Sequence, residues 1–208
     1  MSTNTMIKEI KEYAEINDVP IMQDEGIDYL TTFIIKHQIT SVLEVGTAIG
    51  YSAIMMALAN PRLKVVSIER DEERYLEALK NVKKFDLEDR ITLLFKDALD
   101  VKINDKFDLI FLDGAKGQNI NFFEHFERNL NDGGFFVTDN IEFHGYVLKD
   151  ENEIKSRNLR GLVRKIKEYI AFLKENPNYT TTFISKGDGI AVTEKKEIGW
   201  YYENCYSM

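Results

Sequence analysis

The sequence predicts an α/β fold, a three-layer sandwich in which helices cover both faces of a mostly parallel sheet. Short apolar runs alternate with segments of helical period between residues 42 and 138, which is the pattern of repeated βα units. The first five predicted strands are almost continuously apolar, as expected for strands buried on both faces. Two further strand-like runs near the carboxyl end predict a closing antiparallel hairpin.

Two helices are predicted before the sheet, over Met6–Ile16 and Gly26–His37, because their apolar residues recur at helical spacing. The predicted parallel strands are Val42–Val45, Lys64–Ile68, Ile91–Phe95, Phe107–Leu112 and Gly134–Thr138. The predicted helices that follow strands are Ser52–Ala59, Glu72–Phe85, Ile120–Leu130 and Asn158–Lys174. The hairpin pairs Thr181–Ser185 with Gly189–Thr193 across Lys186–Asp188.

The composition favours one domain over residues 1–208, with helices over about 1–37 and an aromatic tail over 196–208. With 208 residues and 44% apolar content, the chain can bury a full core. Cys205 is the single cysteine, which excludes an internal disulfide and predicts a cytoplasmic location. The charged amino terminus predicts no signal peptide, and no apolar run predicts a membrane span. The aromatic residues of the tail are expected to pack on the body or on a partner chain: Trp200, Tyr201, Tyr202 and Tyr206.

The segment SVLEVGTAIGYS, over residues 41–52, is the most informative part of the chain. A strand leads through an acidic residue into a G-x-x-x-G turn and then into a helix, which places backbone N–H groups and a carboxylate around a small ligand at the carboxyl end of a strand. The turn lacks the G-x-G-x-x-G triplet of dinucleotide folds. It suits a ligand that carries an amino acid and a cation, as S-adenosylmethionine does, although an ordinary strand-to-helix turn has the same pattern.

Two further acidic residues end strands. Glu69 ends the second strand, where a carboxylate commonly accepts hydrogen bonds from ribose hydroxyls, and the alternative is a solvated strand end. Asp97 follows the third strand, where it could hold an adenine amine or simply cap the next segment.

The fourth and fifth strands end on Asp113 and on Asp139 with Asn140. If these strands are neighbours, their polar ends meet at one edge of the sheet and form an all-oxygen site. Such a site suits Mg²⁺ or Ca²⁺ and not zinc, whereas the alternative is that Asp139 and Asn140 only form a turn. Lys116 follows three residues after Asp113 and could act as a general base, because a nearby cation lowers the proton affinity of a lysine. A surface lysine is the other interpretation.

The segment KSRNLRGLVRKIK, over residues 155–167, holds six basic residues and no acidic one in a chain of net charge −8. The overall charge disfavours indiscriminate binding to polyanions, but this segment could form a local phosphate-contacting face. That face would carry Arg157, Arg160, Arg164 and Lys167 at helical spacing. A solvated helix face is the alternative.

Together these segments resemble the cation-dependent O-methyltransferases related to catechol and caffeoyl-CoA methyltransferases. The motifs PIMQDEG, LEVGTAIGYSAI, IERDEER, KDAL, DGAKGQ and TDN carry the resemblance, which runs from about Val19 to Lys195. Within that group the chain most resembles bacterial tRNA 5-hydroxyuridine methyltransferases. It departs from the catechol enzymes at Gly114-Ala115, which replaces a bulkier pair and argues against a small catechol substrate.

The resemblance implies a Rossmann-like class I methyltransferase fold with a seven-stranded sheet in the order 3-2-1-4-5-7-6, a homodimer, and two cofactors. Lys116 would take the place of the catalytic lysine, with Asp113 beside it, and Asp113, Asp139 and Asn140 would bind Mg²⁺. The residues that would contact S-adenosylmethionine are Met22, Gly46, Ser52, Glu69, Asp97, Ala98 and Asp113.

The expected reaction is methyl transfer to a hydroxyl that has a second oxygen beside it, because the metal could bind both oxygens and acidify the hydroxyl. The wobble 5-hydroxyuridine in a tRNA anticodon loop has this pair, and the basic segment could hold the phosphates. A small phenolic or catechol-like acceptor is the alternative. A module that only senses S-adenosylmethionine is a third interpretation, but it has no use for a base and a metal.

Overall fold

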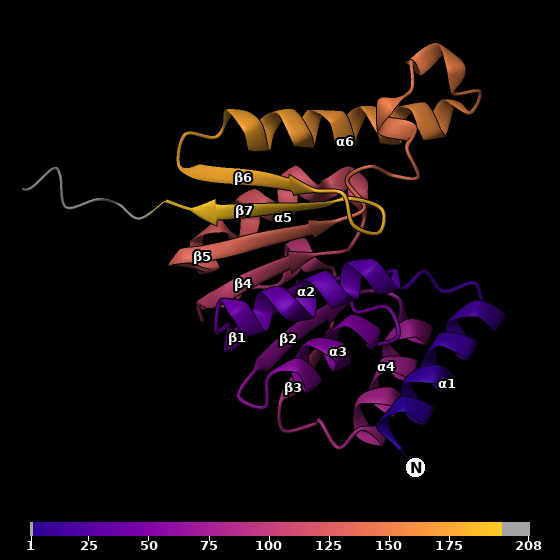
Figure 1. Ribbon diagram of the computed structural model, residues 1–208, viewed down its shortest axis with the longest axis vertical. Coiled ribbons are helices and arrows are strands. Elements are labelled where there is room, and N and C mark those ends of the chain that lie inside the picture. Colours follow the sequence, from indigo (N-terminus) through magenta and orange to yellow (C-terminus); the bar gives the residue numbers. More distant parts are fainter. Residues whose placement is uncertain (1, 197–208) are drawn as a thin grey trace, which may run out of the picture.

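The computed structural model describes residues 2–196, which fold around one seven-stranded sheet (Figure 1). Its order, β3-β2-β1-β4-β5-β7-β6, confirms the predicted order. The first five strands pair in parallel, and β7 runs antiparallel to both β5 and β6. The strands are β1 (Ser41–Val45), β2 (Lys64–Glu69), β3 (Ile91–Phe95), β4 (Phe107–Leu112), β5 (Leu130–Asp139), β6 (Tyr179–Ile184) and β7 (Ile190–Lys195).

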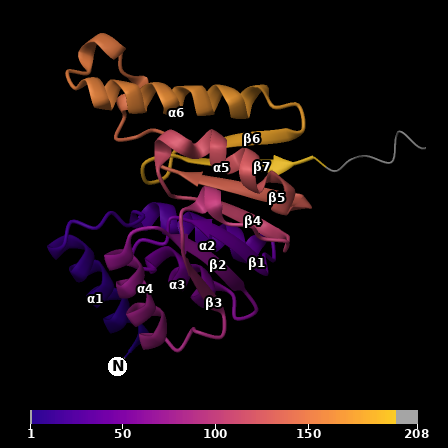
Figure 2. The same ribbon diagram turned by 180° about the vertical axis from the view of Figure 1, so that it is seen from behind.

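Helices cover both faces of the sheet, which confirms the three-layer sandwich. Residues of the first four helices belong to one apolar core, and residues of the last two belong to a second core on the other face. Figure 1 shows α2 in front of the sheet, and Figure 2 shows α5 in front of the opposite face. The helices are α1 (Thr3–Ile16), α2 (Asp24–Lys36), α3 (Tyr51–Ala59), α4 (Glu72–Lys84), α5 (Asn119–Phe126) and α6 (Arg157–Glu175).

Side-chain caps explain where several helices begin. The hydroxyl of Ser2 accepts the Thr5 N–H at 3.2 Å, so α1 begins three residues before the predicted start at Met6. Asp71 caps α4 in the same way, by accepting the Arg74 N–H at 3.0 Å. Ser156 caps α6, the most amphipathic helix, whose buried stripe includes Tyr169.

Two predictions about the strands were wrong. The run ITLLF of β3 is apolar like the buried strands, but β3 is an edge strand, and its Phe95 is 46% exposed. The predicted helix Ile120–Leu130 ends at Phe126, and Leu130 already pairs with Phe107 as the first residue of β5. From Leu130 onward the chain therefore pairs with β4 as a strand, although its apolar residues still have helical spacing up to this point.

None of the helices within residues 2–196 is long and apolar enough to cross a membrane. The predicted aromatic tail, apart from Lys196, and the single cysteine lie outside the described residues.

Candidate active site

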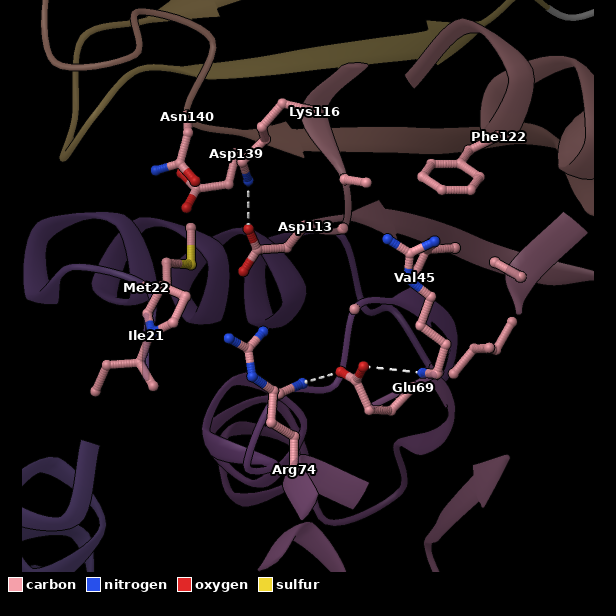
Figure 3. Close-up of a pocket in the computed structure, with 18 of the residues that line it drawn as sticks. Ile21, Met22, Val45, Glu69, Arg74, Asp113, Lys116, Phe122, Asp139 and Asn140 are labelled. Atoms are coloured by element: carbon pink, nitrogen blue, oxygen red, sulfur yellow. Dashed lines mark hydrogen bonds and ion pairs between the residues drawn. The ribbon is translucent and has the colours of Figure 1, made fainter. Parts of the chain in front are cut away.

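A cavity of about 470 Å³ lies where the strand order reverses, at the carboxyl ends of β1, β2, β4 and β5. In open parallel sheets this switch point is where ligands bind, and the volume is typical of a small-molecule site. Figure 3 shows Lys116, Asp139 and Asn140 together at one side of this pocket, and Glu69 at the other. Nine of the predicted site residues line it: Met22, Gly46, Glu69, Asp97, Ala98, Asp113, Lys116, Asp139 and Asn140.

The glycine turn between β1 and α3 forms the floor of the cavity. Gly46 has φ +102°, and a Cβ placed on it would lie 2.6 Å from the carbonyl oxygen of Asp113. Only glycine can therefore hold the turn this close to the end of β4. The N–H groups of Gly46 and Thr47 both donate to the carbonyl of Ile68, which ties the turn to β2 as well.

Glu69 is buried and fixes the same turn from the side of β2. One carboxylate oxygen accepts the backbone N–H groups of Arg70 and Asp71, both at 2.9 Å, and the other accepts the N–H of Ala48 at 2.8 Å. A carboxylate has about four lone-pair positions, so one remains on the oxygen that binds Ala48. Glu69 is thus a structural anchor that keeps one acceptor position for a ligand hydroxyl.

Asp97 takes the capping role that the sequence left open, and its contact with an adenine stays a prediction. One of its oxygens accepts the Leu99 N–H at 3.1 Å and so caps a short 3₁₀ helix, Ala98–Asp100. The other pairs with the guanidinium of Arg70 at 3.2 Å. Asp97 and Ala98 both still line the cavity.

Ser52 is the one predicted cofactor contact that does not line the cavity. It is buried, and its hydroxyl donates to Glu44 at 2.5 Å. Glu44 lies fully buried in β1, where burial, and secondarily the charges of Asp113 and Glu69, raise its pKa to about 8 despite two serine hydroxyl donors. The sequence predicted that the carboxylate before the glycine turn lies beside the ligand, but Glu44 is fully buried and does not line the cavity.

The predicted chemical centre forms at the ends of β4 and β5. These strands are parallel neighbours in which Leu112 is level with Thr138, so Asp113 and Asp139 leave the sheet side by side. Lys116, on the 3₁₀ helix Lys116–Gln118, donates to Asp113 at 2.6 Å. Asn140 follows with φ +58°, a left-handed conformation that asparagine tolerates well.

Asp139 carries the strongest sign of unbalanced negative charge in this centre. It is 2% exposed, and burial followed by repulsion from Asp113 raises its pKa to about 7, against the opposing attraction of Lys116. A hard cation would relieve this repulsion, and two carboxylates with an amide oxygen are the donors that Mg²⁺ prefers. The residues therefore fit a divalent cation. Among the described residues, no group of three acidic, histidine or cysteine side chains is placed to hold a metal ion. The predicted trio is not such a group, because its third member, Asn140, is an amide.

Asp188, in the turn between β6 and β7, is a site residue that the sequence did not predict. One of its oxygens accepts the backbone N–H of His144 at 2.5 Å, and the other is buried without a hydrogen bond among the described residues. The His144 ring lies 3.4 Å from that second oxygen, and His144 lines the mouth of the cavity together with Phe143. No motif surrounds Asp188, so only the fold could bring it here.

The cavity also has basic and apolar walls that the sequence did not predict. Arg70, Arg74 and Lys96 line it near Asp97, and the segment Pro20–Gln23 between α1 and α2 closes one side. The latter lies within the PIMQDEG motif, of which only Met22 was predicted to contact the ligand.

The predicted basic face on α6 lies away from the cavity lining, and much of it contacts the chain itself. Arg160 donates to the carbonyl groups of Ile154 and Lys155 at 2.6 and 3.2 Å. Arg164 pairs with Glu151 at 3.0 Å. Lys167 donates to the carbonyl of Lys149 at 3.1 Å, so three of the four predicted cations hold the segment 149–155.

Comparison with known proteins identifies the class of protein that this fold and site define. A family model described as O-methyltransferase matches residues 2–196. The chain belongs to this O-methyltransferase family.

Individual relatives agree with that assignment. A Staphylococcus aureus structure assigned provisionally to the caffeoyl-CoA O-methyltransferases is 35% identical, with 94% of this chain and 93% of that one covered and a TM-score of 0.87. A flavonoid 3',5'-methyltransferase from Vitis vinifera is 27% identical over 88% of this chain and 81% of its own length. An O-methyltransferase from Bacillus cereus, described in complex with SAH, shares the fold at 22% identity, with 94% and 93% covered and a TM-score of 0.81.

Proposed function

We propose that this protein transfers the methyl group of S-adenosylmethionine to a hydroxyl oxygen that has a second oxygen beside it. The observation that carries the proposal is the convergence of Asp113, Lys116, Asp139 and Asn140 on one cavity at the switch point of the sheet. The SAH bound to the Bacillus cereus relative is the product that remains after such a transfer.

The cofactor would lie across the glycine turn. The free acceptor position of Glu69 would bind a ribose hydroxyl, and Asp97 and Ala98 would flank the adenine. Met22 would close over the cofactor, and Gly46 would leave room for its methionine end. In this arrangement Ser52 supports the turn through Glu44.

The acceptor would lie between Lys116 and Asp188. Lys116 would take the proton of the hydroxyl, whose oxygen then forms a bond to the methyl carbon while the bond from that carbon to sulfur breaks and a neutral thioether leaves. A divalent cation held by Asp113, Asp139 and Asn140 would supply the positive charge that acidifies the hydroxyl. Asp188 lines the same cavity, and one of its oxygens is buried without a hydrogen bond among the described residues.

For the acceptor itself we propose the wobble 5-hydroxyuridine of tRNA. The basic segment supports a phosphate-binding role, because an arginine has five donors and Arg160 and Arg164 each commit one terminal nitrogen to the chain's own groups. Lys165 extends this charge toward the site, since its side chain packs on Gly117 beside Lys116. Phe143 at the mouth could stack on a base that is turned out of a single-stranded loop.

A small hydroxylated aromatic acceptor is the second candidate. It is favoured by the contacts that Arg160, Arg164 and Lys167 make within the chain, and by the acceptors named for relatives such as the flavonoid enzyme. The homodimer and the cytoplasmic location stay predictions.

One assay separates these alternatives. The purified protein is given S-adenosylmethionine, Mg²⁺ and either tRNA that contains 5-hydroxyuridine or a catechol, and products are identified by mass spectrometry. Formation of 5-methoxyuridine supports the tRNA proposal, and methylation of catechol alone replaces it with the second candidate. If calorimetry shows that the cofactor binds but no hydroxyl is methylated, the proposed methyl transfer is contradicted, and a module that only senses S-adenosylmethionine is favoured.

A further inference from the structure

Arg74, in the first turn of α4, is a half-buried cation of the cavity lining. No ion pair or hydrogen bond joins its guanidinium to another residue in the described part of the chain. Two other cations of the lining already have acidic partners. Arg70 pairs with Asp97 at 3.2 Å. Lys116 pairs with Asp113 at 2.6 Å. The positive charge of Arg74 is therefore available to an anionic group of a ligand.

The packing of α4 brings this cation to the glycine turn. Ala78 of α4 contacts the end of the turn, since a Cβ placed on Gly50 would lie 3.4 Å from the Cβ of Ala78. Asn81 of the same helix donates to the carbonyl of Ile49 at 2.9 Å. Arg74 lies four residues before Ala78, and so it occupies the face of α4 that packs on the turn.

The beginning of α4 is also tied to the turn by hydrogen bonds. Glu69 accepts the N–H of Ala48 in the turn and the N–H of Asp71, the N-cap of α4. Asp71 in turn accepts the N–H of Arg74 at 3.0 Å. Figure 3 shows the side chain of Arg74 entering the pocket between Glu69 and Met22. The guanidinium therefore reaches the part of the cavity that the glycine turn borders.

Helix stability does not account for an arginine at this position. The first turn of α4 carries Glu72 and Glu73, which suit the positive end of the helix dipole, whereas a cation there is disfavoured. No ion pair joins Arg74 to either acid among the described residues. A cation that opposes the dipole, lacks an acidic partner and enters the cavity indicates a role in ligand binding.

We propose that Arg74 binds the carboxylate at the methionine end of the cofactor. This inference rests on the proposed cofactor site, in which that end lies at Gly46. A guanidinium matches a carboxylate with two parallel, charge-assisted hydrogen bonds. Ser52, which was predicted to contact the cofactor, is not available for this role, because its hydroxyl donates to Glu44. Arg74 thus makes the site select ligands that carry an intact amino-acid end.

The test compares S-adenosylhomocysteine with its decarboxylated analogue, S-adenosyl-3-thiopropylamine, which keeps the ammonium group and lacks the carboxylate. Calorimetry on the full chain gives the Kd of each ligand. The wild type should bind S-adenosylhomocysteine about 10- to 100-fold more tightly, as expected for a charge-assisted hydrogen bond. Arg74→Gln should weaken the binding of S-adenosylhomocysteine by a similar factor and leave the Kd of the analogue nearly unchanged, so that the preference disappears. Arg74→Lys keeps the charge without the planar fork and should restore part of the preference.

Lys96→Gln is the matched control, because it removes another cation of the lining, one that precedes Asp97 at the proposed adenine end. It should keep the wild-type preference. Three outcomes would overturn the inference and leave the cofactor site intact: equal binding of both ligands by the wild type, a preference that persists in Arg74→Gln, or its equal loss in Lys96→Gln. The first outcome needs no variant, so the test stands even if Arg74→Gln does not fold. No binding of either ligand to the wild type would instead overturn the cofactor site, and the inference with it.

Discussion

At the scale of single residues, Asp113 contacts the site through its carbonyl, its N–H and its side chain. Its backbone carbonyl excludes a side chain at position 46, its N–H donates to Val45, and its carboxylate accepts from Lys116. It also repels Asp139 and Glu44. A cation at this place would therefore weaken the repulsion that Asp113 exerts on Asp139 and on Glu44.

The first prediction concerns this negative charge. Asp139→Asn keeps the shape of the side chain and removes a charge that a cation needs, so we expect turnover to fall by about 100-fold or more while the fold persists. Asp113→Ala, and the double change Asp139→Ala with Asn140→Ala, should abolish turnover. Initial rates and circular dichroism check this. EDTA should inhibit the wild type and Mg²⁺ should restore it; full activity in excess chelator would rule out a metal.

The second prediction concerns Glu69. Glu69→Gln should weaken the binding of S-adenosylhomocysteine by about 1–3 kcal/mol, because a charge-assisted hydrogen bond to the ribose is lost, and it should lower Tm slightly, because its amide nitrogen cannot accept a backbone N–H. Glu69→Ala should weaken binding at least as much and also lower Tm, since the N–H groups of Ala48, Arg70 and Asp71 lose their acceptor. Calorimetry and thermal melts separate the two effects. Unchanged affinity in the Gln variant would leave Glu69 with the anchoring role alone.

At the scale of elements, α6 serves both the core and the surface. Its buried stripe includes Tyr169, whose hydroxyl bonds Thr138 of β5 at 2.8 Å. Its basic face contacts the segment 149–155, which follows the mouth residues Phe143 and His144. A substitution on this face can therefore affect both the proposed phosphate binding and the position of the segment 149–155. The two effects need separate controls.

The third prediction makes that separation. Arg160→Glu with Arg164→Glu should raise KM for tRNA steeply and leave methylation of a small catechol nearly unchanged, because the face lies away from the cavity. For each phosphate that the protein no longer neutralises, the magnitude of the salt slope of tRNA binding should fall by about 0.7–0.9. Glu151→Gln is the matched control, since it removes the partner of Arg164 and keeps the cation. If Glu151→Gln has the same effect, or if both acceptors suffer equally, the helix is structural.

The elements also show where sequence reasoning succeeds. Asp113 and Asp139 could be predicted to meet because parallel strands end at one edge of a sheet, and hydrophobic runs identify such strands well. The local pattern does not give the edge position of β3, because ITLLF is as apolar as a central strand; only the family resemblance placed it there. The resemblance also implied that β7 pairs with β5, but it did not single out Asp188, and no local pattern marks this residue as part of the site. The hydrogen bond from Ser52 to Glu44 could not be predicted either, because it depends on how α3 packs against β1.

At the scale of the whole molecule, the buried acid of β1 should affect stability as a function of pH. The pKa of Glu44 is about 8 in the folded chain, against an ordinary value of 4.5, so the folded state holds a proton that the unfolded state has released between these pH values. The unfolded state binds fewer protons, and stability therefore falls as pH rises through this range.

The fourth prediction follows from that sign. The free energy of unfolding of the wild type should fall between pH 5 and pH 8 more steeply than that of Glu44→Gln, with a difference in slope that approaches about 1.4 kcal/mol per pH unit. Asp139, whose pKa is raised from 3.8 to about 7, contributes in the same direction between these two pH values, but it is present in both proteins. Urea denaturation at each pH measures the difference. Parallel curves for the two proteins would show that Glu44 is ionised when folded.

The insertion of β7 between β5 and β6 has a consequence for how the protein is made. Ribosomes synthesise β6 before β7. Among the described strands β6 pairs only with β7, and one edge of β5 also stays unpaired until β7 is made. The turn that carries Asp188 belongs to the same late segment. A growing chain can therefore assemble β1–β5 and the glycine turn while it is still attached to the ribosome, but the part of the cavity lining that Asp188 supplies is absent. Activity begins only after residues 190–195 have left the exit tunnel.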